Sequence, residues 1–164
     1  MGNTLNAITL TIGMLVSDGT ATHKDWKDYR WAVVPATSCS AGPICISARA
    51  KWDWKRPQWV EFSAVPSSKG LEAKIRLINE DRKDDDNVCI TVLFLSSDGS
   101  ALSILHKNLH SLPQAVRSET VDIALRASLL RRITSIALGT KQCRRGPHED
   151  DDVYRRAKAR LKMR

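Results

Sequence analysis

Hydrophobic and polar residues alternate in several segments of the first 106 residues, with the period of two that is typical of strands with one buried face. The clearest case is residues 7–16, where Ile8, Leu10 and Ile12 share one face and threonines occupy the other. Clusters of Gly, Pro, Ser and Asp, which favour turns, separate such segments. The predicted strands cover residues 7–16, 31–34, 44–55, 58–65, 71–80, 88–95 and 101–106.

One of these segments is open to a second interpretation. Residues 71–80 also tolerate a helix, because Leu71, Ile75 and Ile78 lie at helical spacing, but the alternation favours a strand. The run 88–95 is apolar throughout, which predicts a central strand covered on both faces.

The period changes to that of a helix after the strands. Ser111, Pro113 and Gln114 together have the pattern of a helix start, with a capping serine, an early proline and a reciprocal glutamine. From residue 119 to 138 the apolar residues recur on one stripe, which predicts a long amphipathic helix. A narrower helical pattern covers residues 153–163, with acids before it and cations along it, as the helix dipole favours.

These patterns predict an α+β fold. We expect an antiparallel sheet of about five to seven strands in residues 7–106, covered by a long C-terminal amphipathic helix. The chain of 164 residues suits one domain, so residues 1–140 are predicted to form it and residues 141–164 a basic, partly helical tail.

The charge of the chain indicates an anionic partner. The net charge is +8 and the pI is about 9.6, which favours nucleic acid or an acidic membrane surface. Residues 141–164 hold nine Lys or Arg against four acids, which is +5 of that total. The apolar fraction of 42% and the charged fraction of 27% are ordinary for a folded domain and argue against global disorder.

The cysteines and the start of the chain bear on location. The four cysteines form no C-x-x-C pair and no dense framework, so we expect reduced thiols and a cytoplasmic or nuclear protein that is not secreted. No apolar run reaches the roughly 18 residues that span a bilayer, and the first residues lack the basic region of a signal peptide. Gly2 would permit acylation, although Asn6 stands where the myristoylation signal has Ser or Thr.

Motifs for catalysis are absent from the sequence. It contains no G-x-S-x-G elbow, no P-loop and no G-x-G-x-x-G, so we expect no enzymatic activity and no cofactor. Two metal sites are conceivable from the residue types. One would use the clustered acids at residues 84–86 and 149–152, as in metal nucleases, and the other would use His106, His110, Cys143 and His148. Acids and histidines in loops are more often simply solvated, so no metal is predicted.

Residues 48–62 interleave three of the five tryptophans with four cations. With period two, Trp52 and Trp54 share a face, and we expect both to fill the core while the cations stay at the surface. Trp26 lies in a charged segment and is the better candidate for an exposed aromatic. The predicted nucleic-acid contacts are Arg49, Lys51, Lys55 and Arg56 in this hairpin, and Lys141, Arg144, Arg145, Arg155, Arg156, Lys158, Arg160 and Lys162 in the tail.

The leading hypothesis is a non-enzymatic basic binding or assembly protein. Its partner would be nucleic acid, with RNA favoured, or a ribonucleoprotein, with a possible acidic membrane surface and self-association. In layout alone, a small basic α+β chain without catalytic motifs resembles several viral assembly proteins, among them the matrix proteins of negative-strand RNA viruses, and that resemblance implies a structural role. The alternatives are a small metal-dependent, nuclease-like enzyme and an adaptor for an acidic protein.

Overall fold

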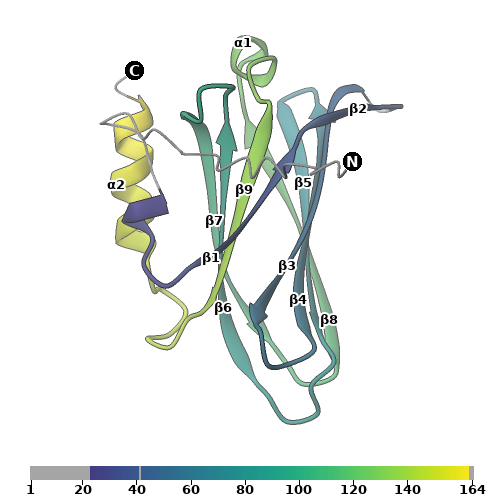
Figure 1. Cartoon of the computed structure of the whole chain (residues 1–164), viewed down its shortest axis with the longest axis vertical. Helices are drawn as coiled ribbons and strands as arrows, with labels where there is room; N and C mark the ends of the chain where they lie inside the picture. Colours follow the sequence, from purple (N-terminus) through teal and green to yellow (C-terminus); the bar gives the residue numbers. More distant parts are fainter. Residues whose placement is uncertain (1–22, 41, 163–164) are drawn as a thin grey trace, which may run out of the picture.

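The computed structural model describes residues 23–40 and 42–162, which form two antiparallel sheets packed face to face (Figure 1). The predicted strand at residues 7–16 lies outside the described residues. The strands are β1 (Arg30–Pro35), β2 (Thr37–Cys39), β3 (Gly42–Asp53), β4 (Gln58–Ser67), β5 (Gly70–Asn79), β6 (Asp86–Leu95), β7 (Ala101–Ser111), β8 (Ala115–Ala124) and β9 (Ser135–Gln142). The helical elements are a 3-10 turn at His23–Asp25, the one-turn helix α1 (Ala127–Leu130) and α2 (Asp151–Lys162).

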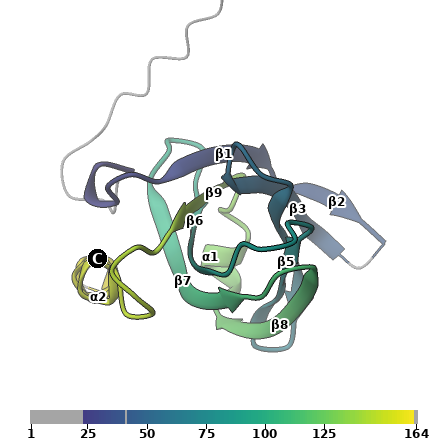
Figure 2. The same cartoon turned by 90° about the horizontal axis from the view of Figure 1, so that it is seen from below.

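The smaller sheet has the strand order β1-β9-β6-β7, and the larger sheet has the order β2-β3-β4-β5-β8. Strand β3 contacts β1 and β9 along one side, and β7 contacts β8 along the other. Seen along the strands, the two sheets therefore enclose a core, and α2 lies outside them beside β7 (Figure 2). Helix α1 lies at one end of the sandwich, and the turn of the β3–β4 hairpin lies toward the other (Figure 1).

The core between the sheets follows from the alternation in the sequence. In β4 the side chains of Val60 and Phe62 are fully buried, and in β5 Ile75 is too, whereas their neighbours along each strand face outward. Phe62 meets Phe94 of β6 across the two sheets, with ring centroids 6.2 Å apart and an interplanar angle of 66°.

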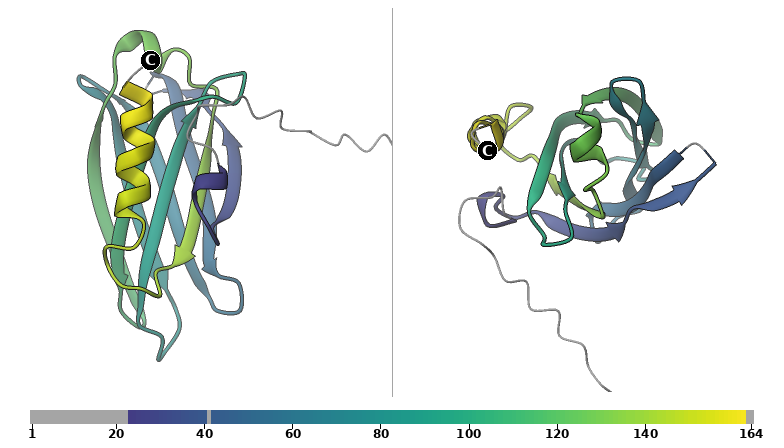
Figure 3. Two further views of the ribbon diagram at one scale, coloured as in Figure 1. Left: turned by 90° about the vertical axis from the view of Figure 1, so that its left-hand side faces the viewer. Right: turned by 90° about the horizontal axis from the view of Figure 1, so that it is seen from above.

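The smaller sheet is also buried on its outer face. Leu93 of β6 and Ala137 of β9 point away from the larger sheet, where they pack with Trp26 and with Ala157 of α2. Helix α2 runs along this face (Figure 3). The prediction of a central strand covered on both faces at residues 88–95 is thus confirmed.

The predicted α+β fold is wrong, because no long helix covers the sheet. Half of the predicted helix at residues 119–138 falls in strands β8 and β9, which are joined by a loop that holds α1. Val121 and Ile123 alternate with exposed Thr120 and Asp122, and β8 pairs along its whole length with the β5 edge. The apolar residues that recur at helical spacing in the sequence therefore belong to two strands, which lie in different sheets, and to the loop between them.

The expectation of reduced thiols is also wrong. All four cysteines are in disulfides, which join Cys39 to Cys45 and Cys89 to Cys143. Each pair comes from chain segments that the sheet register brings together, with Cα atoms 5.9 Å and 5.4 Å apart. No short sequence motif predicts the second disulfide, because its two cysteines are 54 residues apart.

Among residues 23–40 and 42–162, no helix is both long enough and apolar enough to cross a membrane.

Replacing Phe94 tests the packing between the sheets. Phe94→Ala should lower the free energy of unfolding by about 3–5 kcal/mol, because it leaves a cavity beside Phe62. Urea denaturation measures the change, and Val116→Ala is the control, since Val116 is 59% exposed and its truncation should change stability by less than about 0.5 kcal/mol. Equal stability of the two variants would contradict the packing described here.

Candidate functional site

The hairpin cations that the sequence predicted lie in separate environments. Arg49 and Lys51 extend from the outer face of the larger sheet and lie over the ring of Trp59, at 4.7 Å and 5.2 Å from its centroid. Arg49 also lies 3.7 Å from a carboxylate oxygen of Glu61. Both cations are thus on the surface, as expected.

Arg56 is held by acids of two loops. Its guanidinium lies 2.6 Å from Asp84, 3.6 Å from Asp81 and 3.4 Å from Asp53. Its charge is therefore largely balanced, and it would contribute little to anion binding. Lys55, by contrast, is exposed at the tip of the turn.

Four of the eight predicted tail cations are likewise in ion pairs. The ion pairs are Lys141 with Glu149 and Asp150, Arg145 with the same two acids, Arg156 with Asp152, and Arg160 with Asp25. Lys158 donates a hydrogen bond to the hydroxyl of Tyr154. Of the predicted tail contacts within the described residues, Arg144, Arg155, Lys158 and Lys162 are exposed and have no ion pair. The tail is thus not one continuous basic surface.

Lys141 is the centre of a buried ion cluster. Its Nζ lies 2.9 Å from Glu149 and 2.6 Å from Asp150, and the three side chains are each only 7% exposed. Lys141 also lies 4.9 Å from the ring centroid of Tyr29, and burial raises the pKa of that phenol. Burial alone would raise the pKa of Glu149, but hydrogen bonds from the backbone N–H of Arg145 and from Lys141 lower it.

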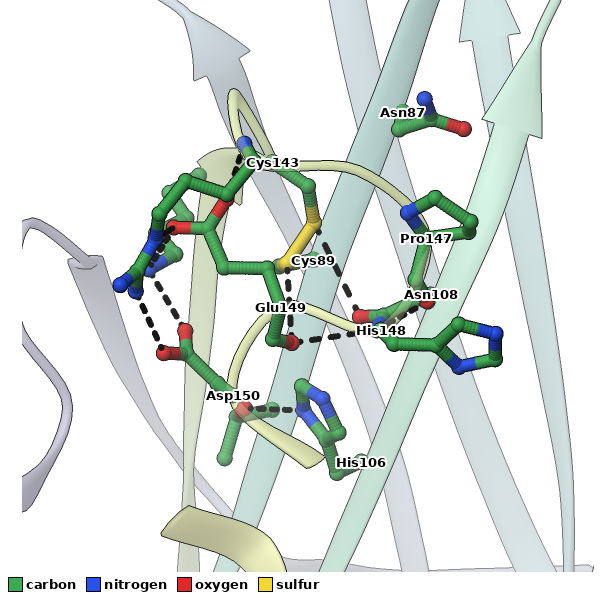
Figure 4. The surroundings of a disulfide bond; sticks show 12 residues. Asn87, Cys89, His106, Asn108, Cys143, Pro147, His148, Glu149 and Asp150 are labelled. Atoms are coloured by element: carbon green, nitrogen blue, oxygen red, sulfur yellow. Dashed lines mark hydrogen bonds and ion pairs between the residues drawn. A yellow bond between two sulfur atoms is a disulfide. The ribbon is translucent and has the colours of Figure 1, made fainter. Parts of the chain in front are cut away.

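The segment from 143 to 150, which we call the arm, connects β9 to α2 and is fastened to the smaller sheet (Figure 4). The disulfide ties Cys143 to Cys89 of β6. The side-chain amide of Asn108 on β7 donates to the carbonyl oxygens of Pro147, at 2.6 Å, and Glu149, at 3.1 Å. These bonds place the arm beside the end of β9.

His106 lies beneath the arm and the first turn of α2. Its ring lies 5.3 Å from that of Trp26 and 5.7 Å from that of Tyr154, and its Nδ1 is 2.9 Å from the hydroxyl of Thr91. Its Nε2 is buried without a hydrogen bond and lies 3.7 Å from a carboxylate oxygen of Asp151. Burial lowers the pKa of this imidazole, although Asp151 and Asp150 oppose the shift.

The four residues of the zinc alternative do not converge. Cys143 is in a disulfide, His106 is buried, and His148 is 88% exposed at its side chain. His110 lies at the far end of β7, 3.1 Å from Asp85. Within the part of the chain that the structure describes, no group of three or more His, Cys, Asp or Glu is placed to hold a metal ion.

A buried polar network closes the sandwich near the hairpin. Asp86 accepts hydrogen bonds from the indole N–H of Trp52, at 3.1 Å, and from the amide of Gln142. Burial and the neighbouring Asp84 raise the pKa of Asp86. The amide of Gln58 donates to Asp84 at 2.8 Å, so these acids serve as structural acceptors.

Beside this network lies a pocket of about 530 Å³ between the start of β1, the hairpin turn, the end of β9 and the arm. Trp54 stands at its edge with 60% of its surface exposed. The guanidinium carbon of Arg30 lies 6.0 Å from its ring centroid, and the Nζ of Lys55 lies 5.1 Å from it. The lining residues are Asp28, Arg30, Trp52, Asp53, Trp54, Lys55, Thr140, Lys141, Gln142, Arg144 and Glu149.

The tryptophans do not all lie where the sequence placed them. Trp52 is in the core as expected, but Trp54 is exposed, and Trp26, expected outside, is 3% exposed. Strand β3 ends at Asp53 after a register shift, and the backbone N–H of Lys55 donates to the Asp53 carboxylate at 2.8 Å to form a tight turn. Trp54 therefore leaves the strand alternation.

The pocket brings Lys55, Lys141 and Arg144 of the predicted set together, and it adds Arg30, Trp54 and Gln142, which sequence reasoning missed. Arg49, Lys51 and the cations of α2 lie elsewhere. The sequence held one indication that the strand ends before Trp54. Asp53 and Pro57 are residues that favour a turn, and they lie on either side of Trp54.

The comparisons with known proteins identify no family. No family model matches the chain, and no curated protein matches it. Among solved structures it is similar to the enzymatically active domain of bacteriophage CBA120 tailspike protein 4, with 9% sequence identity and a TM-score of 0.27. That match covers 76% of this chain and 18% of the tailspike chain, and so distant a likeness carries no argument about function.

Acidification tests the burial of His106. Because its pKa is lowered on folding, the unfolded chain takes up a proton first, so stability present above the ordinary pKa of about 6.5 is lost as the pH falls below it. We expect unfolding free energy to fall by at most about 1.4 kcal/mol per pH unit from this group. Urea denaturation from pH 7.5 to 5 should show a flatter profile for His106→Gln.

The control is Thr120→Ala, which replaces an exposed side chain that does not titrate and should keep the wild-type profile. The raised pKa of Asp86 contributes a slope of opposite sign, but it does so in wild type and variants alike. Identical pH profiles for His106→Gln and wild type would contradict the account.

Proposed function

We propose that this protein is a non-enzymatic binding protein for single-stranded nucleic acid, with RNA favoured, and that a base stacks on Trp54 at the pocket. The observation that carries the proposal is an exposed tryptophan flanked by Arg30 of β1 and Lys55 of the hairpin turn. Exposed aromatic rings hold unpaired bases, and neighbouring cations hold the phosphates between them.

The lining of the pocket supports the same ligand class. Arg144 adds a third exposed cation to the lining, whereas the charge of Lys141 is balanced by Glu149 and Asp150. The Asp28 carboxylate and the Gln142 side-chain carbonyl supply acceptors for the edge of a base or a ribose hydroxyl. A large ring left in water beside two cations is unusual for a residue whose role is packing.

The other hypotheses have less support. The resemblance to viral matrix proteins rested on an α+β layout, which the two-sheet fold removes. The oxygens of Asp84 and Asp86 are engaged by Arg56, Gln58 and Trp52, which leaves no observation that favours a metal-dependent enzyme.

The disulfides bear on where the protein works. The Cys89–Cys143 bond is buried, and disulfides form and persist in oxidising compartments. In place of the cytoplasmic or nuclear location predicted from the sequence, we propose an oxidising setting. Intact-mass measurement with and without a reductant, followed by thiol alkylation, tests it, and four free thiols in freshly isolated protein would contradict it.

Removing the exposed ring tests the proposed function. Trp54→Ala should weaken binding of an eight-nucleotide uridine oligomer by about 5- to 100-fold, because one stacked base contributes roughly 1–3 kcal/mol. Fluorescence anisotropy at fixed salt measures the affinity. The fold should be unaffected, since Trp54 lies largely in water, and Val33→Ala, 48% exposed, is the control. Wild-type affinity in Trp54→Ala would refute the proposal.

Measuring affinity over a series of salt concentrations distinguishes binding at the pocket from binding at helix α2. Arg144→Ala should reduce the slope of log affinity against log salt by about 0.7, the value for one phosphate contact on a single strand. Arg155→Ala on α2 is the matched control, because that exposed cation does not line the pocket. Heparin, which has charge but no bases, should bind without any effect of Trp54→Ala. An effect of Arg155→Ala alone would assign binding to the tail.

A further inference from the structure

A second tryptophan of the same hairpin has a similar environment on another surface. In β4, Val60 and Phe62 point into the core, so Trp59 faces outward on the larger sheet, where it is partly buried. Arg49 and Lys51 lie over its ring, as Arg30 and Lys55 lie beside Trp54. The hairpin therefore carries two tryptophan rings, each next to two cations.

The strand register extends the Trp59 surface across the sheet. Lys51, Trp59, Ile78 and Val116 are aligned in one row over β3, β4, β5 and β8. Ile78 is partly buried and Val116 is exposed, so the row presents apolar area to solvent. Such a row offers a flat surface on which a base or a sugar can rest.

The adjacent row keeps this surface cationic. Arg76 lies 2.6 Å from Glu61, and Arg49 lies 3.7 Å from the same carboxylate, so one acid is shared by two arginines. Trp59 and its adjacent row thus hold three cations, Arg49, Lys51 and Arg76, against the one acid Glu61. That excess is complementary to phosphate, and a guanidinium lying over an indole also presents a flat face for stacking.

We propose that Trp59, with Arg49 and Lys51 over its ring, is a second stacking site for the strand whose first base lies on Trp54. This inference rests on the proposed function. Trp54 is the first residue of the four-residue turn from 54 to 57, Trp59 follows two residues after that turn, and exposed Lys55 lies between them in the chain. A single strand thus passes from the pocket around the turn onto the outer face of the sheet, and it occupies more nucleotides than the pocket alone holds.

Oligonucleotide length tests the path. With the full chain, affinity for uridine oligomers should rise from two to eight nucleotides beyond the statistical effect of added sites. Trp59→Leu, which keeps apolar bulk, should weaken binding of the octamer by about 5- to 100-fold and leave the dinucleotide unchanged. Trp59→Phe keeps an aromatic face and should restore most of the octamer affinity.

The control is Thr120→Ala on the same face, which lies two rows from Trp59 in the register and should bind both ligands as wild type does. Thermal melts of each variant confirm that the sheet is intact, and Trp59→Phe serves as the test variant if Trp59→Leu unfolds, with a smaller loss for the octamer only. Wild-type octamer affinity in Trp59→Leu, or equal losses for both lengths, overturns the second site. If Trp54→Ala still weakens both ligands, the proposed function stands without it.

Discussion

Burial of the smaller sheet on both faces is the constraint on which the other features depend. A sheet whose central strand is apolar on each side must be covered twice, and the larger sheet supplies only one cover. The second is supplied by the segment around Trp26 and by α2, two parts of the chain that are far apart in sequence. The Arg160 to Asp25 ion pair, at 2.6 Å, joins them directly.

That second cover also builds the pocket. For α2 to lie on the sheet, the arm must turn beside the end of β9, where the disulfide and the Lys141 cluster hold it. The arm then places Arg144 and Glu149 opposite the hairpin turn and Trp54. A buried lysine paired with two acids costs desolvation of all three charges, and losing one partner would leave the others uncompensated. One wall of the pocket is therefore held by a buried ion cluster and a disulfide.

The strands were predictable where alternation reports burial, as in residues 58–65 and 71–80, which are strands β4 and β5. The prediction of secondary structure failed where pairing between distant strands determines the structure. Residues 115–124 become strand β8 because the β5 edge needs a partner, a fact that no local period contains. Counting cations also overstated the exposed charge. The acid that pairs with Arg160 lies 135 residues away, but Lys141 and Arg156 pair with acids within nine residues, which the local sequence could have indicated. Trp54 was assigned to the core because the alternation was assumed to continue past Trp52. The register shift between Lys51 and Asp53 breaks that alternation.

Photochemical crosslinking tests the central claim that a base lies on Trp54. An octamer carrying 5-iodouridine would be irradiated in complex with the full chain, and the adduct located by peptide mass mapping with fragmentation. We expect an adduct on Trp54, within the tryptic peptide of residues 52–55. Adducts confined to α2, or spread over the surface without preference for Trp54, would contradict it.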